Sequence, residues 1–467
     1  MKRHEFDFCV IGAGSAGYVA ATTARGLGKT VAFAESPRPL AGLCILRGCM
    51  PSKTLLRSAE IAHFVKTAPH FGIEPGPLSV NMHRVIQRKR HIIDAFAAYR
   101  RQGIGEFPIL RGAPKFVGAN ELQVGDERIR AAAFLIAAGS VVNVPEIPGL
   151  RDTGFVTSDD VLEMASLPES VVVLGGGFVA CELAQYLVRL GVQTVMLQRS
   201  PTLLSAEDPE IGAEVRDALE SDGMKIFTGV SFVRVERAGN KKAVVVRIDG
   251  EERRFEGAEL FAALGRRPNL EGLNIDAAAV QSDGWGLVVN EFLQTTNPAV
   301  YAAGDVIGSR ELVHVAVYEG QLAARNAFSD TKTAADYSLQ AARALFTDPQ
   351  AAVAGLSERD CKERDIPYET ASYPFDDHGK ALAVGLTRGF VKLVVSPDQG
   401  RILGVAIVGA EASDLIHEGI ALLYFKATCD DVMLMPHLHP TLAEIITYPA
   451  EELCDRLKHR RYALVTP

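Results

Sequence analysis

Two stretches of the chain share the same order of apolar and small residues. Phe6–Ser36 and Ser170–Ser200 each start with an apolar run, pass through a glycine-rich turn and a helix-favouring stretch, and end in a second apolar run. This order predicts strand, tight turn, helix and strand in both copies. The repeat therefore predicts two dinucleotide-binding units of one architecture. The small residues of the two turns are Gly12, Gly14 and Gly17, and Gly175, Gly177 and Ala180.

The rest of the pattern predicts a third unit. An apolar strand and a proline-rich link at Phe134–Gly149 indicate a crossing from the first unit to the second, and the apolar run that ends at Asp305 indicates a return. Beyond Leu345, short strands and helices without a glycine motif predict an α+β domain suited to dimerisation. The expected fold is α/β, with two Rossmann-like domains and this C-terminal domain. The predicted domains are residues 1–149 with 270–344, residues 150–269, and residues 345–467.

Composition and charge narrow the class of protein. A hydrophobic share of 48% is typical of a globular chain, and 467 residues suffice for roughly two to four domains. The net charge of −8 gives no general attraction to nucleic acid or to an anionic membrane. The basic run His83–His91 is predicted to be a solvated helix face. No stretch reaches the roughly 18 apolar residues of a membrane span, and the N-terminus lacks a signal peptide's apolar core. We therefore expect a cytoplasmic protein.

The ends of the second strands predict how each unit reads a ribose. Glu35 and Gln198 each follow the first glycine of their motif by 23 residues, so their positions are equivalent. A glutamate accepts hydrogen bonds from both ribose hydroxyls of FAD or NAD. A neutral glutamine does not repel a 2′-phosphate, and Arg199 beside it could pair with one. The first site therefore suits FAD or NAD, and the second leans weakly toward NADP over NAD.

Seven cysteines form an odd, dispersed set, unlike the disulfide framework of a secreted protein. Only Cys44 and Cys49, in GLCILRGCMPSK, form a close pair with a distinctive setting. Zinc would need further ligands that this stretch lacks, so we predict no metal site. Pro51 predicts a helix start that places Cys49 near free N–H groups, and Lys53 adds a positive charge; both favour a thiolate. The residues alone leave a redox disulfide and two inert buried thiols as alternatives.

The cysteine segment resembles the redox-active segment of the flavin-dependent pyridine nucleotide:disulfide oxidoreductases, whose pattern is close to GGxCxxxGCxPSK. The motifs around it occur in the family's order and cover essentially the whole chain. They are the first glycine motif, Glu35, AAGS at 137–140, the second glycine motif with Glu182, ALGRRPN at 263–269, YAAGD ending at Asp305, FTDP at 346–349, and HPTLAE at 439–444.

The resemblance implies roles for these residues. FAD would occupy the first unit, with Asp305 at its ribityl chain or phosphate, and the nicotinamide coenzyme would occupy the second. Lys53 beside the flavin would pair with Glu182. Electrons would pass from NAD(P)H through the flavin to a Cys44–Cys49 disulfide, with Cys49 against the flavin and Cys44 meeting the substrate. Further cofactor contacts are expected from Gly139, Gly265, Arg266 and Ala316.

The resemblance also implies an acid/base pair supplied by a second subunit. His439 matches the family's base, and Glu444 matches the carboxylate that orients it. Thiol exchange requires proton transfer as each sulfur attacks or leaves, which suits a histidine. In this family the two residues come from the other subunit. An obligate homodimer with a shared active site is therefore expected.

Three kinds of family member compete for the substrate. Dihydrolipoamide dehydrogenase is favoured by GYVAA at 17–21, PSK and HLHPTL, and would add a small lipoyl-type substrate and a place in a 2-oxo acid dehydrogenase-type complex. Glutathione reductase is disfavoured, because Thr22 and Thr23 stand where its paired arginines are expected. Mercuric reductase is supported by Arg199, but the C-terminus has Cys454 alone where adjacent cysteines are expected, and we expect no N-terminal metal-binding CxxC domain.

The cysteine segment departs from the family pattern at two positions. Ala41 replaces the first glycine, and Arg47 stands where a small apolar residue is common. Arg47 could raise the flavin potential, contact a pyrophosphate or point to solvent. Together with Gln198, these departures predict a lipoamide-dehydrogenase-like relative whose natural disulfide is open.

Overall fold

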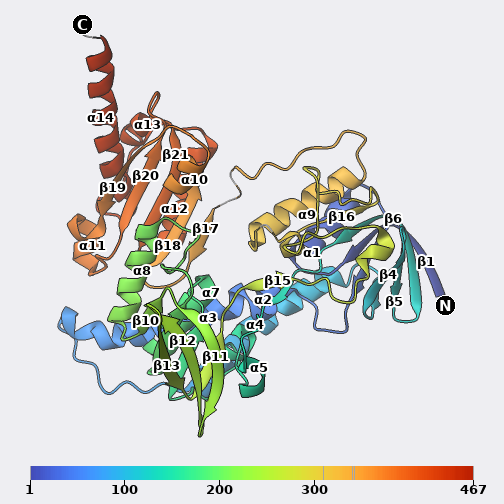
Figure 1. The fold of residues 1–467 in the computed structure, drawn as a ribbon. Coiled ribbons are helices and arrows are strands. Elements are labelled where there is room, and N and C mark those ends of the chain that lie inside the picture. The colour runs from blue at the N-terminus through green and yellow to red at the C-terminus, as the bar shows by residue number, and fades with distance from the viewer. Residues whose placement is uncertain (1, 309, 339, 341, 466–467) are drawn as a thin grey trace.

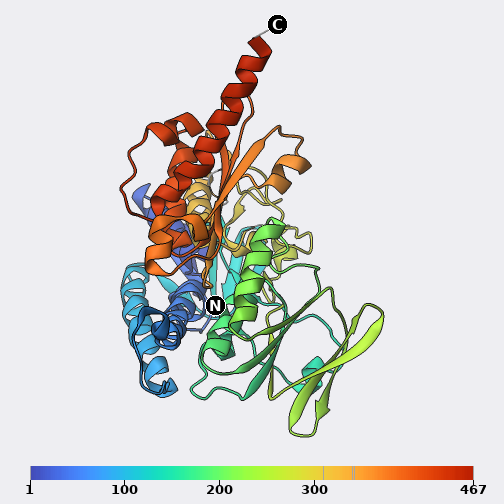
Figure 2. The ribbon, with the colours of Figure 1, turned by 90° about the vertical axis from the view of Figure 1, so that its left-hand side faces the viewer.

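The computed structural model describes residues 2–308, 310–338, 340 and 342–465. Figure 1 shows two α/β units and a C-terminal domain of helices packed on an antiparallel sheet. Figure 2 shows that the C-terminal helix projects beyond the rest of that domain. This architecture confirms the predicted fold class.

One mixed sheet forms the core of the first unit. Strands β3, β2, β1 and β6 are parallel, and β5 and β4 extend the sheet as an antiparallel meander. The late strand β16 pairs in parallel with β6, so the chain returns to this sheet, as the sequence predicts. Helices α1 (Ser15–Gly26) and α9 (Val313–Ala327) pack closely, because a Cβ on Gly320 would lie 2.3 Å from the Ala16 carbonyl oxygen. The strands are β1 (Lys2–Ile11), β2 (Val31–Glu35), β3 (Ile109–Arg111), β4 (Pro114–Gly118), β5 (Glu121–Val124), β6 (Glu127–Ile136) and β16 (Val300–Ala302).

A helical segment between β2 and β3 carries the cysteine motif. It contains α2 (Leu43–Arg47), α3 (Cys49–Thr67), a 3₁₀ turn η1 (Ala68–Phe71) and α4 (Met82–Ile104). The basic run on α4 is not wholly solvated, which corrects the prediction. Lys89 is buried, donates a hydrogen bond to the Leu162 carbonyl (2.6 Å) and pairs with Glu163. This lysine thereby ties α4 to the second unit.

The second unit repeats the parallel βαβ arrangement. Its sheet has the order β10-β9-β8-β14, and a three-stranded antiparallel sheet follows it. A short ladder between β7 (Ser140–Val142) and β15 (Arg266–Pro268) joins the segments that enter and leave this unit. The other elements are α5 (Leu150–Thr153), α6 (Ser158–Val161), β8 (Ser170–Leu174), α7 (Phe178–Arg189), β9 (Gln193–Gln198), α8 (Pro209–Ser221), β10 (Lys225–Thr228), β11 (Ser231–Ala238), β12 (Lys241–Ile248), β13 (Glu251–Gly257) and β14 (Glu259–Ala262). The 3₁₀ turns η2 (Ile275–Ala278) and η3 (Asp305–Ile307) contribute to the core of the first unit.

The C-terminal domain has a five-stranded antiparallel sheet of order β17-β18-β21-β20-β19. Helices α12 and α14 contribute apolar side chains to its core, which includes Ile416, Leu453 and Leu457. The elements are β17 (Arg343–Leu345), β18 (Gln350–Gly355), α10 (Glu358–Glu363), β19 (Glu369–Pro374), η4 (Phe375–Asp377), α11 (Gly379–Val384), β20 (Phe390–Val395), β21 (Ile402–Gly409), α12 (Ala412–Tyr424), α13 (Cys429–Leu434), η5 (Ala443–Ile446) and α14 (Thr447–Val465).

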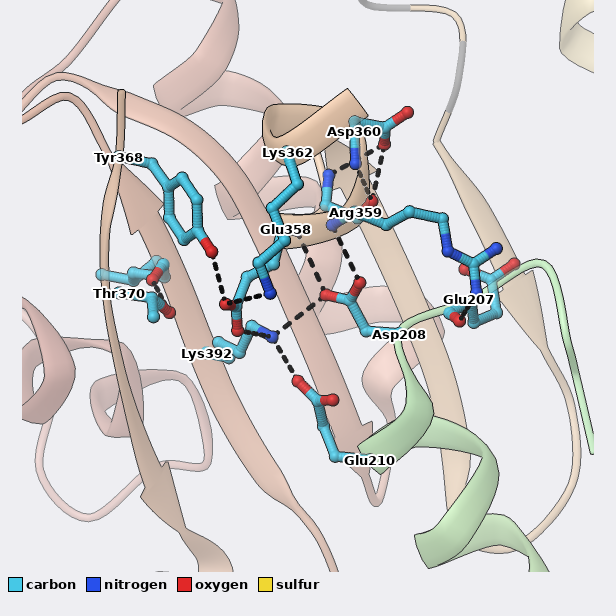
Figure 3. Close-up of polar contacts among 12 residues, drawn as sticks. Glu207, Asp208, Glu210, Glu358, Arg359, Asp360, Lys362, Tyr368, Thr370 and Lys392 are labelled. Atoms are coloured by element: carbon cyan, nitrogen blue, oxygen red, sulfur yellow. Dashed lines mark hydrogen bonds and ion pairs between the residues drawn. The ribbon is translucent and has the colours of Figure 1, made fainter. Parts of the chain in front are cut away.

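A buried lysine joins the C-terminal domain to the second unit. Lys392 on β20 donates to Asp208 (3.0 Å), which precedes α8, and to Glu358 on α10 (2.7 Å), and it also pairs with Glu210 (Figure 3). These carboxylates raise the pKa of Lys392 against the opposing effect of burial. Nearby, Arg343 pairs with Glu207 at 2.6 Å. Ion pairs of Lys392 with Asp208 and Glu210, and of Arg343 with Glu207, thus form only when the two domains are docked.

Candidate active site

Two glycines of the first turn, Gly12 and Gly17, leave no room for a side chain. Gly12 has φ +98°, and a Cβ there would lie 2.4 Å from the Ala137 carbonyl oxygen. A Cβ on Gly17 would lie 1.9 Å from the Gly12 carbonyl oxygen, and one on Gly42 would lie 2.8 Å from the Gly14 Cα. Helix α1 begins directly after Gly14 without a side-chain cap and without an acidic residue in its first turn. Its N–H groups therefore suit a pyrophosphate, as bound FAD would present.

Glu35 lies at the end of β2, beside this turn. One carboxylate oxygen accepts a hydrogen bond from the Ala13 N–H (2.7 Å), and the other accepts one from the Ser36 N–H (2.8 Å). The Ser36 hydroxyl also donates to this second oxygen (3.1 Å), whereas the oxygen bonded to the Ala13 N–H keeps a further lone pair for a ribose hydroxyl. The position fits the predicted ribose contact.

The second glycine turn has the same construction. Gly175 has φ +113°, and a Cβ there would lie 2.3 Å from the Ala263 carbonyl oxygen. Gly177 precedes α7, which also lacks a side-chain cap. Gln198 ends β9 and packs against Gly176, where a Cβ would lie 3.0 Å from the Gln198 Cγ. Arg199 is exposed beside it. This turn therefore suits a second dinucleotide.

The paired thiols lie where two helices meet. Cys44 is on α2, Cys49 is the first residue of α3, and Gly48 between them has an unusual backbone conformation that is neither helical nor extended (φ −130°, ψ −119°). A hydrogen bond with Cys44 is the largest cause that lowers the pKa of Cys49 to about 7, and the charge of Lys53 adds to it against the effect of burial. The same hydrogen bond raises the pKa of Cys44. The pair thus holds one thiol and one readily formed thiolate.

Lys53 follows one helical turn after Cys49 and joins the two dinucleotide-binding units. Its ammonium donates to both carboxylate oxygens of Glu182 on α7, at 2.8 and 3.1 Å. Glu182 also accepts the Phe346 N–H (3.0 Å), and the Phe346 ring lies 4.4 Å from the ammonium. Phe346 lies within the FTDP motif, but its contact with this ion pair could not be predicted from the sequence. The predicted pairing of Lys53 with Glu182 is present in the structure.

The remaining predicted cofactor residues cluster where the units join. Ser140 donates to the Asp305 carboxylate (2.7 Å) and accepts from the Arg266 guanidinium (2.8 Å). Gly139 and Gly265 flank this network with φ of +68° and +94°. Ala316 packs on the Gly304 turn just before Asp305, since a Cβ on Gly304 would lie 3.4 Å from the Ala316 Cβ. Ser140 was not singled out in the sequence, although it links the two charged residues.

His439 and Glu444 lie together far along the chain. His439 Nδ1 lies 3.1 Å from a Glu444 oxygen, and the His439 side chain is 79% exposed. Hydrogen bonds from His439 and from the Thr441 N–H lower the pKa of Glu444 against the effect of burial. The carboxylate therefore remains charged and orients the imidazole.

A second histidine, which the sequence did not single out, lies behind this pair. His378 is buried, and its Nε2 lies 3.6 Å from the other Glu444 oxygen. Within the described part of the chain, neither ring nitrogen has a hydrogen-bond partner. Burial lowers the pKa of His378 against the opposing charge of Glu444, which favours the neutral imidazole. No sequence signal near Asp376–Lys380 marks this contact.

The structure shows the surroundings of Ala41 and Arg47, the two positions at which the cysteine segment departs from the family pattern. Ala41 is buried with φ +142°, a region that favours glycine, so this backbone conformation costs about 1–3 kcal/mol. Arg47 pairs with Asp159 on α6 at 2.9 Å. The sequence did not predict this ion pair, which links Arg47 to the second unit.

Comparison with known proteins gives the class to which this site belongs. A model of the pyridine nucleotide-disulphide oxidoreductases matches residues 6–320, and a model of the same proteins' dimerisation domain matches residues 341–450. A mercuric reductase of Staphylococcus aureus is 33% identical over 446 residues, which cover 94% of this chain and 81% of that protein. A dihydrolipoyl dehydrogenase of Bacillus subtilis is 32% identical over 461 residues, which cover 95% of this chain and 96% of that protein.

A solved structure has the same fold. The Cu(II) complex of the HOCl-induced flavoprotein disulfide reductase RclA from Escherichia coli matches with a TM-score of 0.85 at 22% identity, over 96% of this chain and 99% of that chain. The site and these matches define a flavin-dependent oxidoreductase. The chain belongs to the pyridine nucleotide-disulphide oxidoreductase family, which uses FAD and NAD(P)H, and its dimerisation domain supports a homodimer. Among the described residues, no helix has the length and apolar character needed to cross a membrane.

Proposed function

We propose that this protein reduces or oxidises a small, neutral disulfide or dithiol of the lipoyl type, using NAD(P)H and FAD. The observation that supports this proposal is the asymmetric thiol pair, with the pKa of Cys49 lowered to about 7 and that of Cys44 raised. Bound FAD would supply two-electron transfer between the nicotinamide and the disulfide. The first glycine turn with Glu35 would hold its ADP part, and the network of Ser140, Asp305 and Arg266 would hold its centre.

The two sulfurs have different tasks in disulfide reduction. Deprotonated Cys44 attacks one sulfur of the substrate disulfide, and the other substrate sulfur leaves as a thiolate that takes up a proton. The Cys49 thiolate then attacks Cys44, re-forms the Cys44–Cys49 disulfide and releases the second substrate thiolate. Because the pKa of Cys44 is raised, the first attack requires a base. The Lys53 ammonium stabilises the Cys49 thiolate between these steps.

His439 is the base in this proposal, and it acts on the thiol pair of the partner subunit. Its side chain is largely exposed in one protomer, yet Glu444 fixes its orientation at 3.1 Å. An exposed, oriented imidazole suits a site completed across a dimer interface. His439 would accept the Cys44 proton and later return it to the leaving thiolate, and Glu444 would stabilise the imidazolium.

The coenzyme proposal rests on Gln198 and Arg199. An amide at the end of β9 leaves the 2′-position free of negative charge, and exposed Arg199 can move to pair with a phosphate. We therefore infer a modest preference for NADPH over NADH. A cytoplasmic enzyme, free or docked in a 2-oxo acid dehydrogenase-type complex, agrees with this chemistry.

Mercury reduction is a second candidate, because several relatives at 33–34% identity are named mercuric reductase. The oriented His439–Glu444 pair favours disulfide chemistry, since proton transfer is needed there and not for capture of Hg(II) by thiolates. Cys454, the nearest cysteine to the C-terminus, is buried. Glutathione disulfide is disfavoured as the substrate for a different reason, because Thr22 and Thr23 offer no cation to its carboxylates.

Steady-state rates test the proposal. The purified holoenzyme is assayed with NADH and NADPH, each against lipoamide, glutathione disulfide and Hg(II). We expect lipoamide to be the best of the three, with large losses in Cys44→Ala and His439→Ala. A substantially faster Hg(II) reduction that survives in either variant would overturn the disulfide assignment.

A further inference from the structure

The C-terminal domain contains a second pair of cysteines that the sequence keeps apart. Cys429 is the first residue of α13, and Cys454 lies near the middle of α14. Their sulfur atoms and a carboxylate oxygen of Asp430 all lie within 4.8 Å of one another. Both cysteines are buried, with 1% and 3% exposed. The fold thus creates a cluster of three potential ligands.

Local structure fixes this cluster. Thr428 and Asp431 form a capping box that sets the start of α13. The Cys429 N–H donates to the Gly400 carbonyl (2.8 Å), and a Cβ on Gly400 would lie 2.7 Å from the Cys429 sulfur. The Cys429 side chain therefore packs directly against the backbone of Gly400. From the other side, the Cys454 thiol contacts both Cys429 and Asp430.

The donor set distinguishes this cluster from ordinary buried thiols. A buried cysteine usually packs as a small apolar side chain. Here two sulfurs converge with a carboxylate, which is a set that thiophilic cations such as Zn²⁺ bind. Zinc–sulfur bonds of about 2.3 Å place tetrahedral ligands about 3.8 Å apart, and because the three ligand atoms already lie within 4.8 Å of one another, at most a small contraction is needed. Asp430 also lies 3.5 Å from the exposed Lys458, a weak pairing that a divalent cation would displace.

We propose that Cys429, Cys454 and Asp430 bind one thiophilic divalent cation of the zinc class. Binding forms two metal–sulfur bonds and one metal–oxygen bond, and the two thiol protons pass to solvent without any change of oxidation state. The fourth position is free for water. The cation joins α13 to α14, and these helices flank the segment that carries His439 and Glu444. The site is separate from the thiol pair of the proposed reaction.

Zinc binding to the full-length flavoprotein tests the site. The Cys44→Ser/Cys49→Ser background removes the other thiol pair, and zinc retained after equilibrium dialysis is measured by elemental analysis. We expect one zinc per chain, and a melting temperature raised by several degrees, because a cation bound to the native state stabilises it. Adding Cys454→Ala should abolish this zinc, and adding Asp430→Asn should weaken its affinity at least tenfold. Asp430 is about half exposed, so this second variant should fold even where loss of a buried cysteine impairs folding.

Cys361→Ala is the matched control, because Cys361 is equally buried in the same domain but lies outside the cluster. It should retain one zinc per chain. The site is disproved by zinc that persists in Cys429→Ala/Cys454→Ala, by an absence of zinc in the parent background, or by a Cys429–Cys454 disulfide in the isolated protein. Since no turnover is measured, these outcomes are independent of the proposed disulfide reaction.

Discussion

The two thiol pairs, Cys44 with Cys49 and Cys429 with Cys454, show how surroundings decide what a cysteine can do. The first pair has Lys53 nearby, begins a helix, and includes a thiol whose pKa is lowered to about 7. The second is buried in an apolar core, where burial, Cys429 and Asp430 all raise the pKa of Cys454. The first environment stabilises a thiolate for exchange, whereas the second keeps the proton on the Cys454 sulfur until a cation replaces it.

The largest expected effect is loss of the first pair. Cys49→Ser should lower NAD(P)H-dependent disulfide reduction at least about 10³-fold, because the exchange has no second sulfur to close it. Cys9→Ala, a buried single cysteine outside both pairs, should keep near wild-type rates in the same assay. Comparable losses in both variants would erase the distinction between the first pair and ordinary buried thiols.

His439 tests whether the first pair depends on a partner subunit. His439→Ala should lower the rate by about 10²–10⁴-fold, the usual contribution of a general base. Co-expression of Cys44→Ala and His439→Ala chains should then restore up to about one quarter of wild-type activity, because randomly mixed dimers include hybrids with one intact site. Isolated hybrids without activity would place His439 and Cys44 in the same chain's site.

Alkylation of the reduced protein tests the pKa difference directly. Because the pKa of Cys49 is lowered, its thiolate is present above about pH 7 and is lost as the pH falls below that value. Iodoacetamide labelling of Cys49 should therefore slow about tenfold per pH unit below 7, while Cys454 stays unlabelled. Lys53→Met should raise the pH midpoint of Cys49 labelling, since it removes a positive charge that stabilises the Cys49 thiolate. Mass spectrometry of the labelled peptides measures both sites at once, and equal labelling at pH 7 would contradict the contrast.

A smaller effect is expected on the choice of nicotinamide coenzyme, which supplies electrons to Cys44 and Cys49 but not to Cys429 and Cys454. Gln198→Glu should shift the NADPH/NADH rate ratio several-fold toward NADH, because like charges about 4 Å apart in water repel by about 1 kcal/mol. Gln193→Glu, at the exposed start of the same strand, adds the same charge as a control and should leave the ratio unchanged. An unchanged ratio in Gln198→Glu would remove the argument for NADPH.

The sequence predicted features set by local rules. The glycine turns need positive φ or close backbone approach, so Gly12 and Gly175 could be recognised with their strands and helices. Lys53 and Glu182, like His439 and Glu444, were found through motif order. The distance between the two residues of each pair could not be predicted from the sequence.

Contacts between distant segments without a motif were not predictable. The cluster of Cys429, Asp430 and Cys454 depends on how α13 packs on α14, and Arg47 meets Asp159 only when two domains dock. His378 reaches Glu444 from a strand-to-helix connection 66 residues earlier in the chain. Such pairs depend on tertiary packing, which leaves no periodic signal in the sequence.

Anaerobic reductive titration tests the central claim, that the first thiol pair and not the second exchanges electrons with the flavin. Oxidised holoenzyme is titrated with NADPH and dithionite while flavin absorbance is followed and free thiols are counted. We predict uptake of one electron pair beyond the flavin's own, with new thiols at Cys44 and Cys49, and loss of that extra pair in Cys44→Ala but not in Cys9→Ala. Uptake that is unchanged in Cys44→Ala, or new thiols at Cys429 and Cys454, would contradict the account.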